Sequence, residues 1–380
     1  MDLDMELLNN ISPGKIFPIV TILALGFAAS CGLSDSGTDR NGFSPPDQQD
    51  WLIPLSEIVD GGPGKDGIPS IDQPDFAPAN EITYVPDNRM VIGVHIDGVT
   101  RAYPHQILDW HEIVNDQFGS FDVAVIYCPL TGTGMCWTRT IDGQTTEFGV
   151  SGLLFRNNLI AYDRNTDSNW SQMQLRSVNG AHIGRDIETF QVVETTWATW
   201  KAMYPQSLVH TTNTGFQRNY SGFTYGSDFS TNHNRILFPI QNSDNRLQNK
   251  DRVHGILGSR TRNEPPSVRV YALRDFGDGV ALVRDTFDSE DYLIVGSTEH
   301  DFAAAFRLDD GNGVGNLEFE AVQESLPVVM QDSEGNKWDV FGRAVEGPRS
   351  GTRLPAARSY TGYWYAWADF FPDLQLFEHD

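Results

Sequence analysis

The sequence predicts an α+β, β-rich fold made of two related lobes. Short runs of β-branched and aromatic residues alternate with turn residues, and the chain holds 35 Gly and 20 Pro. The expected helices are few and short. Hydrophobic residues at 39% and charged residues at 21% are typical of a folded globule rather than a disordered chain.

An internal repeat predicts the two lobes. Five residues recur at a constant displacement along the chain: Gly180, Gly184, Trp197, Trp200 and Pro205 recur as Gly347, Gly351, Trp364, Trp367 and Pro372. Two copies are too few for a solenoid. We therefore expect lobe one (83–210) and lobe two (250–380) to pack as a pseudo-twofold pair. The Asn-, Ser- and Gly-rich connector (211–249) should have little regular structure.

The first fifty residues predict export. Lys15 precedes an apolar run at 16–27, and small residues then lead to Cys31, so 1–30 is expected to be a signal peptide. The ending resembles a bacterial lipobox with Cys31 as the lipidated residue; the alternative is an ordinary signal peptide with a chance cysteine. Residues 31–50 then form a tether, and we expect an extracytoplasmic protein, lipid-anchored to the cell envelope at the periplasm or cell surface.

Within lobe one the expected order is strands first and a helix last, with the Gly- and Pro-rich segment 51–82 packing on the lobe. Helices are predicted at 107–116 and 195–205, and lobe two should end in a helix at 361–372. Proline ends the last two. Strands are predicted at 90–96, 100–104, 123–128, 135–139, 145–150 and 158–163.

The charge excludes one class of partner. The chain has 27 Lys and Arg against 51 Asp and Glu, a net charge of -24. A protein that binds the phosphate backbone needs the opposite sign, so no nucleic-acid partner is expected. The membrane is the expected partner through the lipid anchor, together with a small-molecule, metal or envelope ligand.

Residues that occur in only one of the two lobes are not required to build the shared lobe structure. Such residues occur in lobe one, and we therefore predict the functional site there. Lobe two has Ser297 where lobe one has Cys128, and it has no counterpart of the HEIVND string. The residues set apart in this way are Cys128, His111, Glu112, Asn115 and Asp116. We therefore place the chemistry around the hairpin turn CPLTGTG.

The first functional hypothesis is a transition-metal site. Cys128 and His111, with Cys136 or His105, would bind copper or zinc, which favour thiolate and imidazole ligands. The alternative in which the cysteines have only a structural role is a Cys128-Cys136 disulfide across the hairpin. A weaker case for calcium rests on Asp163, Asn165 and Asp167, whose spacing lacks the later residues of an EF-hand.

The second hypothesis is a thiol-dependent hydrolase or acyl-transfer enzyme. Cys128 would be the nucleophile and His111 the base, oriented by Glu112 or Asp116. Backbone N–H groups of the turn would hold an oxyanion. The expected substrate-binding residues are Thr131, Gly132, Lys65 and Asp163.

The third hypothesis is a glycan- or peptide-binding module whose cysteines form a purely structural disulfide. The chain has 9 Trp, 12 Tyr and 22 Phe, and the connector contains NYSGFTYGSDF. These aromatic residues could line a groove between the lobes. The opposing interpretation is that they are core and turn residues.

Several long strings carry a resemblance to a known family. They are GGPGKDGIPSID, RAYPHQILDWHEIVND, IYCPLTGTGMCW, FGVSGLLFRNNLIAYDRNTDSNW and WDVFGRAVEGP. In this order they resemble the prokaryotic domain-of-unknown-function family 3179, from about Trp51 to Glu378. The resemblance implies a secreted, lipid-anchored or membrane-tethered protein and no agreed activity. Many members have Cys-Pro-Leu-Cys where this chain has Thr131 as the fourth residue, so a thioredoxin-like dithiol is excluded here.

Overall fold

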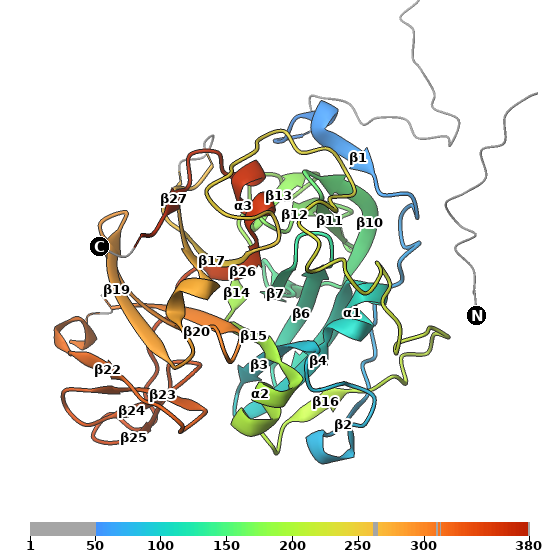
Figure 1. The fold of residues 1–380 in the computed structure, drawn as a ribbon. Coiled ribbons are helices and arrows are strands. Elements are labelled where there is room, and N and C mark those ends of the chain that lie inside the picture. The colour runs from blue at the N-terminus through green and yellow to red at the C-terminus, as the bar shows by residue number, and fades with distance from the viewer. Residues whose placement is uncertain (1–50, 261–264, 309–310, 312, 379–380) are drawn as a thin grey trace, which may run out of the picture. The chain divides into compact units, whose positions relative to one another are not determined.

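Short, mostly antiparallel sheets make up most of the chain. The computed structural model describes residues 51–378 apart from 261–264, 309–310 and 312. Lobe one is coloured blue to light green in Figure 1, the connector is yellow-green to yellow, and lobe two is orange to red. The predicted signal peptide, tether and Cys31 lie outside the described residues.

Lobe one and the segment before it hold three larger sheets. The first has the order β15 (Val192–Thr196), β3 (Met90–Ile96), β4 (Val99–Pro104), β16 (Leu208–His210) and β2 (Phe76–Pro78). The second has the order β14 (Thr189–Phe190), β7 (Thr133–Thr138), β6 (Phe121–Cys128) and β5 (Ile113–Phe118). The third has the order β1 (Ile58–Asp60), β10 (Phe148–Phe155), β11 (Asn158–Asp163), β12 (Asn169–Ser171) and β13 (Arg176–Asn179). The remaining elements are β8 (Thr140–Ile141), β9 (Gln144–Thr145), α1 (His105–His111), α2 (Trp197–Met203), η2 (Leu55–Glu57) and η3 (Ala79–Glu81).

Lobe two also holds three sheets. The first has the order β26 (Ser359–Tyr363), β17 (Arg252–Leu257), β18 (Val268–Ala272) and β27 (Gln375–Leu376). The second is β19 (Ala281–Phe287), β20 (Glu290–Ser297) and β21 (Phe302–Arg307). The third is β22 (Phe319–Ala321), β23 (Val328–Asp332), β24 (Lys337–Asp339) and β25 (Ala344–Glu346). Its helices are α3 (Trp364–Phe370), η4 (Leu273–Phe276) and η5 (Val314–Asn316).

One Gly and one Trp make an equivalent contact in each lobe. A Cβ atom on Gly93 of β3 would lie 1.9 Å from the ring of Trp200, and one on Gly255 of β17 would lie 2.3 Å from the ring of Trp367. Both tryptophans are fully buried. In each lobe, therefore, only a glycine in the first hairpin strand lets the closing helix lay its indole flat on the sheet.

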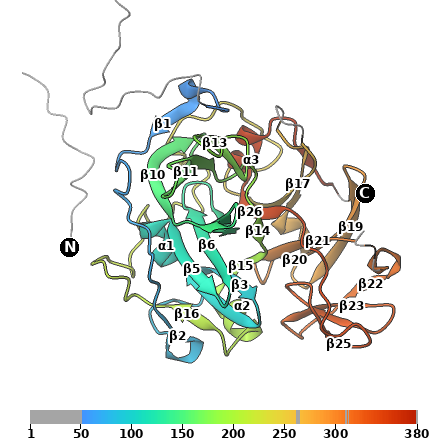
Figure 2. The same ribbon diagram turned by 180° about the vertical axis from the view of Figure 1, so that it is seen from behind.

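The two lobes meet through matched strands. β15 of lobe one packs against β21 of lobe two, and β26 of lobe two packs against β7 of lobe one. The amide of Tyr363 donates to Thr131 O at 2.8 Å across this junction. One hydrophobic cluster contains Trp137 of lobe one and Trp367 of lobe two. The lobes consequently share a core, and Figure 2 shows the junction from behind.

The connector has no helix or strand, as predicted. It runs across α1 and then reaches α3. Gln106 Nε2 donates to Tyr220 O at 2.6 Å, and Trp364 Nε1 donates to Asp244 O at 2.9 Å. The connector is therefore held to both lobes by hydrogen bonds from buried side chains.

The helix predicted at 107–116 is wrong in its second half. α1 ends at His111, Glu112 has a φ of 56°, and Ile113 begins β5. β5 pairs with β6 along its full length, from Ile113 opposite Ile126 to Phe118 opposite Phe121. The two β-branched residues at 113 and 114 are fully buried, so sheet pairing overrides the helical pattern.

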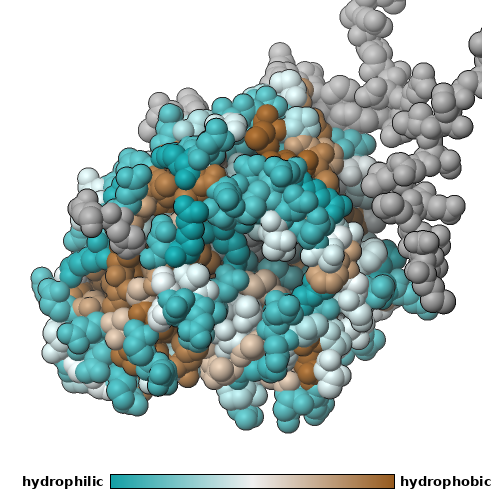
Figure 3. All heavy atoms as spheres, in the orientation of Figure 1, coloured by the Kyte–Doolittle hydropathy of each residue, from teal (hydrophilic) through white to brown (hydrophobic). Residues whose placement is uncertain are grey.

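No helix within the described residues is long and apolar enough to cross a membrane. On the face shown in Figure 3, apolar side chains are interspersed among hydrophilic ones.

The contact between Gly93 and Trp200 gives a test of the fold. Gly93→Ala should lower the free energy of unfolding by about 3 kcal/mol, because the new methyl group must displace a packed indole. Urea denaturation measures this change. The double variant Gly93→Ala with Trp200→Leu should lose less than the sum of the two single variants, whereas simple additivity would contradict the proposed steric contact.

Candidate functional site

The two cysteines of the hairpin lie on opposite faces of the sheet. Cys128 is opposite Thr133, and Cys136 is opposite Val125, three residues from Cys128 on β6. Successive side chains of a strand point to opposite faces, so Cys128 and Cys136 enter different hydrophobic clusters. Both are buried free thiols. The disulfide alternative is therefore wrong, and the pair does not face a common metal.

Cys128 and His111 do not form the predicted catalytic pair. His111 Nδ1 donates to Pro69 O at 2.8 Å, and Nε2 accepts from the hydroxyl of Tyr220 at 2.7 Å. The thiol of Cys128 instead lies 3.7 Å from Asn157 O. Burial, together with nearby Glu112, raises the pKa of Cys128 to about 11, which keeps the thiol protonated and weakly nucleophilic.

The predicted metal ligands are likewise dispersed. Both ring nitrogens of His111 are hydrogen-bonded, to Pro69 and Tyr220, and the ring of His105 lies tilted against that of Tyr127 with 4.1 Å between centroids. Within the part of the chain that the structure describes, no three His, Cys, Asp or Glu side chains are grouped to hold a metal ion. The residues present do not form the predicted Cys/His set for copper or zinc.

The other predicted substrate-binding residues serve different contacts. Thr131 is buried, and its hydroxyl lies 2.9 Å from that of Thr133. Lys65 is exposed and pairs with Asp167. Asp163 accepts from Trp170 Nε1 at 3.0 Å and from Thr166. The carboxylate of Asp163, which was predicted as a calcium ligand, therefore accepts hydrogen bonds within the turn that follows β11.

Of the acids expected to orient His111, Asp116 accepts a hydrogen bond from Arg101 at 2.6 Å and another from the hydroxyl of Tyr103. Glu112 is buried where α1 gives way to β5, with a strained positive φ. Burial, and the charge of Asp109 one helical turn earlier, raise the pKa of Glu112 to about 8. A strained, buried acid of this kind is characteristic of functional sites.

A cavity of about 350 Å³, which we call the connector pocket, is lined in part by Asp109. Its walls come from α1, the β6–β7 turn, β15, the connector and the start of lobe two. Its lining residues are Asn88, Arg89, Met90, His105, Asp109, Tyr127, Pro129, Gly132, Glu194, Phe223, Thr224, Tyr225, Gly226, Ser227, Phe229, Ser230, Thr231, Arg252 and Tyr363. His105 and Gly132 are the predicted site residues that reach it.

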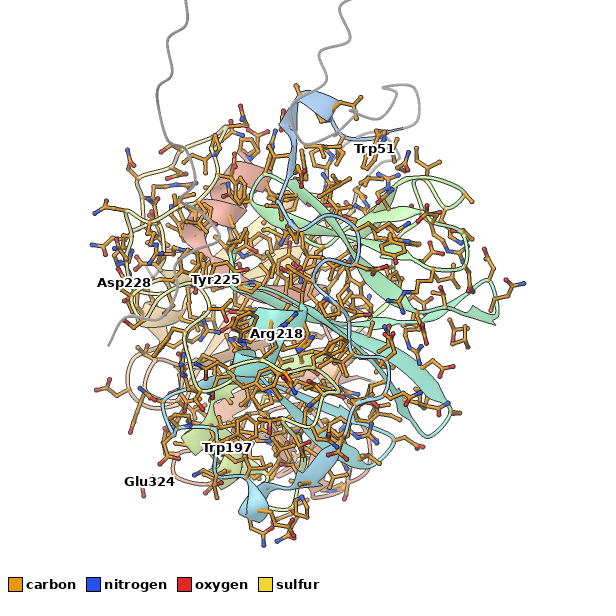
Figure 4. The ribbon with its side chains drawn as sticks, turned by 90° about the vertical axis from the view of Figure 1, so that its right-hand side faces the viewer. Trp51, Trp197, Arg218, Tyr225, Asp228 and Glu324 are labelled. Atoms are coloured by element: carbon orange, nitrogen blue, oxygen red, sulfur yellow. The ribbon has the colours of Figure 1, made fainter. Side chains whose placement is uncertain are left out.

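Two positively charged side chains hold aromatic residues of the connector at the pocket. The guanidinium of Arg89 lies 3.5 Å from the ring centroid of Phe223 and donates to Gly222 O at 3.1 Å. The ammonium of Lys250 lies 3.6 Å from the ring centroid of Phe229. Figure 4 labels Arg218 and Tyr225 on the segment that crosses α1. These contacts give the pocket a preformed aromatic wall.

Burial shifts the titration of the acids that face the pocket. It raises the pKa of Asp109 to about 7, an effect that Arg89 partly offsets. It also raises the pKa of Glu194 to about 7, although Arg252 donates to Glu194 Oε1 at 2.5 Å. Burial and the positive charges of Arg252 and Arg89 hold the pKa of His105 well below its usual value. At neutral pH the pocket therefore offers a neutral imidazole and carboxyl groups that exchange protons.

Sequence reasoning missed Asp109, Glu194 and Arg252. The signal that could have found them is a charged residue within an apolar strand. Glu194 lies between buried residues of β15, and Arg252 begins another apolar strand, β17. Charged residues in such positions are rarely buried unless they are paired. Asp109 lies on α1 one turn after His105, so the two share a helical face.

The thiols give one test. In the native protein, Cys128 and Cys136 should resist iodoacetamide, and both should react fully after unfolding without any reductant, because they are buried, protonated and unlinked. Peptide mass spectrometry separates them from Cys31. Rapid native labelling of Cys128, or a linked Cys128-Cys136 peptide, would contradict this arrangement.

The buried acids give a second test. An acid whose pKa is raised by folding stabilises the fold below its unfolded pKa and loses that contribution as pH rises through its folded pKa. The free energy of unfolding should therefore fall between pH 5 and pH 9. In Glu112→Gln this fall should be smaller by about 3 kcal/mol, as measured by urea denaturation. Glu320→Gln, an exposed change on β22, should keep the wild-type slope; equal slopes in both variants would refute the assignment.

The comparisons place the chain in a family without assigning an activity. No curated protein and no solved structure matched it. A family model described as a protein of unknown function, DUF3179, matches residues 65–374, which include the connector pocket, lobe one and lobe two as far as residue 374. The chain therefore belongs to the DUF3179 family.

Proposed function

We propose that the protein is an extracytoplasmic binding protein that holds a small glycan fragment in the connector pocket. The observation that carries this proposal is the pocket wall itself. Tyr225, Phe223 and Phe229 of the connector line a cavity that His105 and Asp109 also line. Of the three functions considered from the sequence, geometry favours the binding module.

The chemistry of the wall favours a polyhydroxylated ligand. The connector contributes the hydroxyl groups of Thr224, Ser227, Ser230 and Thr231 to the lining. Hydroxyl groups both donate and accept, and the neighbouring aromatic rings offer flat apolar faces. A sugar presents the same combination of hydroxyl edges and an apolar face. A cavity of about 350 Å³ lies at the small end of ligand pockets, which suits a fragment rather than a polymer.

The charges favour a neutral ligand over a peptide with charged ends. Arg252 is already paired with Glu194 and Asp301, so it is not available as a free carboxylate receptor. Asp109, with a pKa of about 7, is partly protonated at neutral pH and can donate to a ligand hydroxyl. His105 Nε2 is buried without a partner among the described residues and can accept from one.

We also infer that the lobes arose by duplication and that lobe one kept the site. The sheet orders β15-β3-β4-β16 and β26-β17-β18-β27 support this inference, since in each the first two pairings are antiparallel and the third is parallel. Directly after the hairpin strand, lobe one has His105 and lobe two has Leu273. Lobe two also fills the space beside Gly296 with the ring of Phe276. The equivalent place in lobe two therefore has no counterpart of His105.

The predicted export signal is the basis for proposing an anchored location. The apolar run and small residues before Cys31 are the basis for proposing a lipid anchor, with the described domain held outside the cytoplasm. An envelope glycan would be accessible there.

Calorimetric titration with mono- and disaccharides, including N-acetylglucosamine, tests the proposal. At least one sugar should bind, and Tyr225→Ala and Asp109→Ala should each weaken binding about tenfold by removing a ring face or a hydrogen-bonding group. Phe216→Ala, which truncates an exposed connector ring outside the pocket, should bind like wild type. Binding of dipeptides but no sugar would contradict the ligand class, and unchanged affinity in both pocket variants would contradict the site.

A further inference from the structure

A second cavity, which the proposed function does not use, lies where the lobes meet. We call it the inter-lobe pocket; its volume is about 640 Å³, and its walls include residues of β7, β15, β21 and β26. Small side chains make the room. Gly134 of β7 and the consecutive alanines 303–305 of β21 all line the cavity.

Two buried side chains present unpartnered atoms to this pocket. Glu194 and His254 are 5% and 4% exposed, and both line the cavity. Glu194 Oε2 and His254 Nε2 have no hydrogen-bond partner within the described residues. A Cβ atom on Gly134 would lie 2.7 Å from Glu194 Oε2, so it is the missing side chain that leaves this oxygen open to the pocket. Buried polar atoms without partners are costly unless a ligand or water completes them.

In its ionised form Glu194 accepts hydrogen bonds at both oxygens, and a neutral His254 can accept one at Nε2. Glu194 Oε1 is held by Arg252, which leaves Oε2 for the inter-lobe side. Burial lowers the pKa of His254 to about 3, so its ring is neutral. The His254 Nδ1 atom lies 3.1 Å from Thr361 Oγ1. When Nδ1–H donates to this hydroxyl, Nε2 is an acceptor.

The outer part of the pocket adds negative charge. Glu188, Asp288 and Glu290 line it, and the basic residues there are Arg307 and Arg358. Arg358 is already paired with Asp186, which also lines the cavity. Together with Glu194, these acids outnumber the arginines among the described residues of the wall.

We propose that the inter-lobe pocket is a second binding site, for a small organic cation whose ammonium group donates to Glu194 Oε2 and His254 Nε2. An ammonium group supplies several donors and one positive charge, which matches paired acceptors in an acidic pocket. Because one carboxylate and one imidazole are fewer ligands than a structural metal site uses, an organic cation fits better than a metal ion. Glu194 becomes the wall common to both pockets, with one oxygen turned to each.

Calorimetric titration of the full-length chain with ethylammonium and with putrescine tests this site. At least one amine should bind, and Glu194→Gln and His254→Leu should each weaken binding at least tenfold. Ser359→Phe provides a variant at a half-buried wall position that should exclude the amine sterically and leaves both buried acceptors in place. Tyr225→Ala, in the connector pocket, should bind the amine as wild type does.

The outcomes separate the two pockets. Loss of amine binding in Ser359→Phe with retained sugar binding supports the inter-lobe site, whatever the stability of the buried variants. Three results would overturn it: no binding of either amine, equal binding in wild type and Ser359→Phe, or binding of Zn²⁺ or Ca²⁺ in place of the amines. Failure of sugar binding alone would overturn the proposed function and leave this inference standing.

Discussion

The ion pair between Glu194 and Arg252 is the interaction on which the site depends. It joins β15 of lobe one to β17 of lobe two, and Arg252 also pairs with Asp301. Removing one partner of such a buried pair costs about 3 to 5 kcal/mol, because the remaining charge stays buried. The pair therefore fixes how the two lobes meet. It also places Glu194 between the connector pocket and the inter-lobe pocket, so the geometry of both cavities follows from it.

Burial then sets the chemistry of the connector pocket. Asp109, Glu112 and Glu194 all have raised pKa values because the surrounding sheets and connector exclude water. The same burial keeps Cys128 protonated, and His111, the predicted base, is hydrogen-bonded to Pro69 and Tyr220 instead. A thiol enzyme needs the opposite arrangement, with an ionised sulfur beside a histidine. What the fold provides instead is a set of hydrogen-bonding groups facing an aromatic wall, which suits recognition of a neutral ligand.

The fold could be predicted further from the sequence than the site could. The strands at 90–96 and 158–163, the closing helices and the unstructured connector follow from local periodicity and turn residues. The prediction that Cys128 and Cys136 lie together was wrong because it depends on the register of β6 and β7. The register sets the sheet face to which each side chain points, and no short-range sequence pattern specifies it. Glu194 and Arg252 meet only when the two lobes pack together, so their ion pair depends on tertiary structure and no local sequence pattern predicts it. The aromatic connector could be predicted as a ligand-binding segment because its aromatic residues are visible in its composition alone.

The measurement that tests the account most directly is a crystal structure of the protein with N-acetylglucosamine at a saturating concentration. The account predicts a sugar ring in the connector pocket, with its apolar face on Tyr225 or Tyr363 and a hydroxyl within hydrogen-bond distance of Asp109. A sugar bound at another surface, or a connector that leaves α1 and abolishes the cavity, would contradict it.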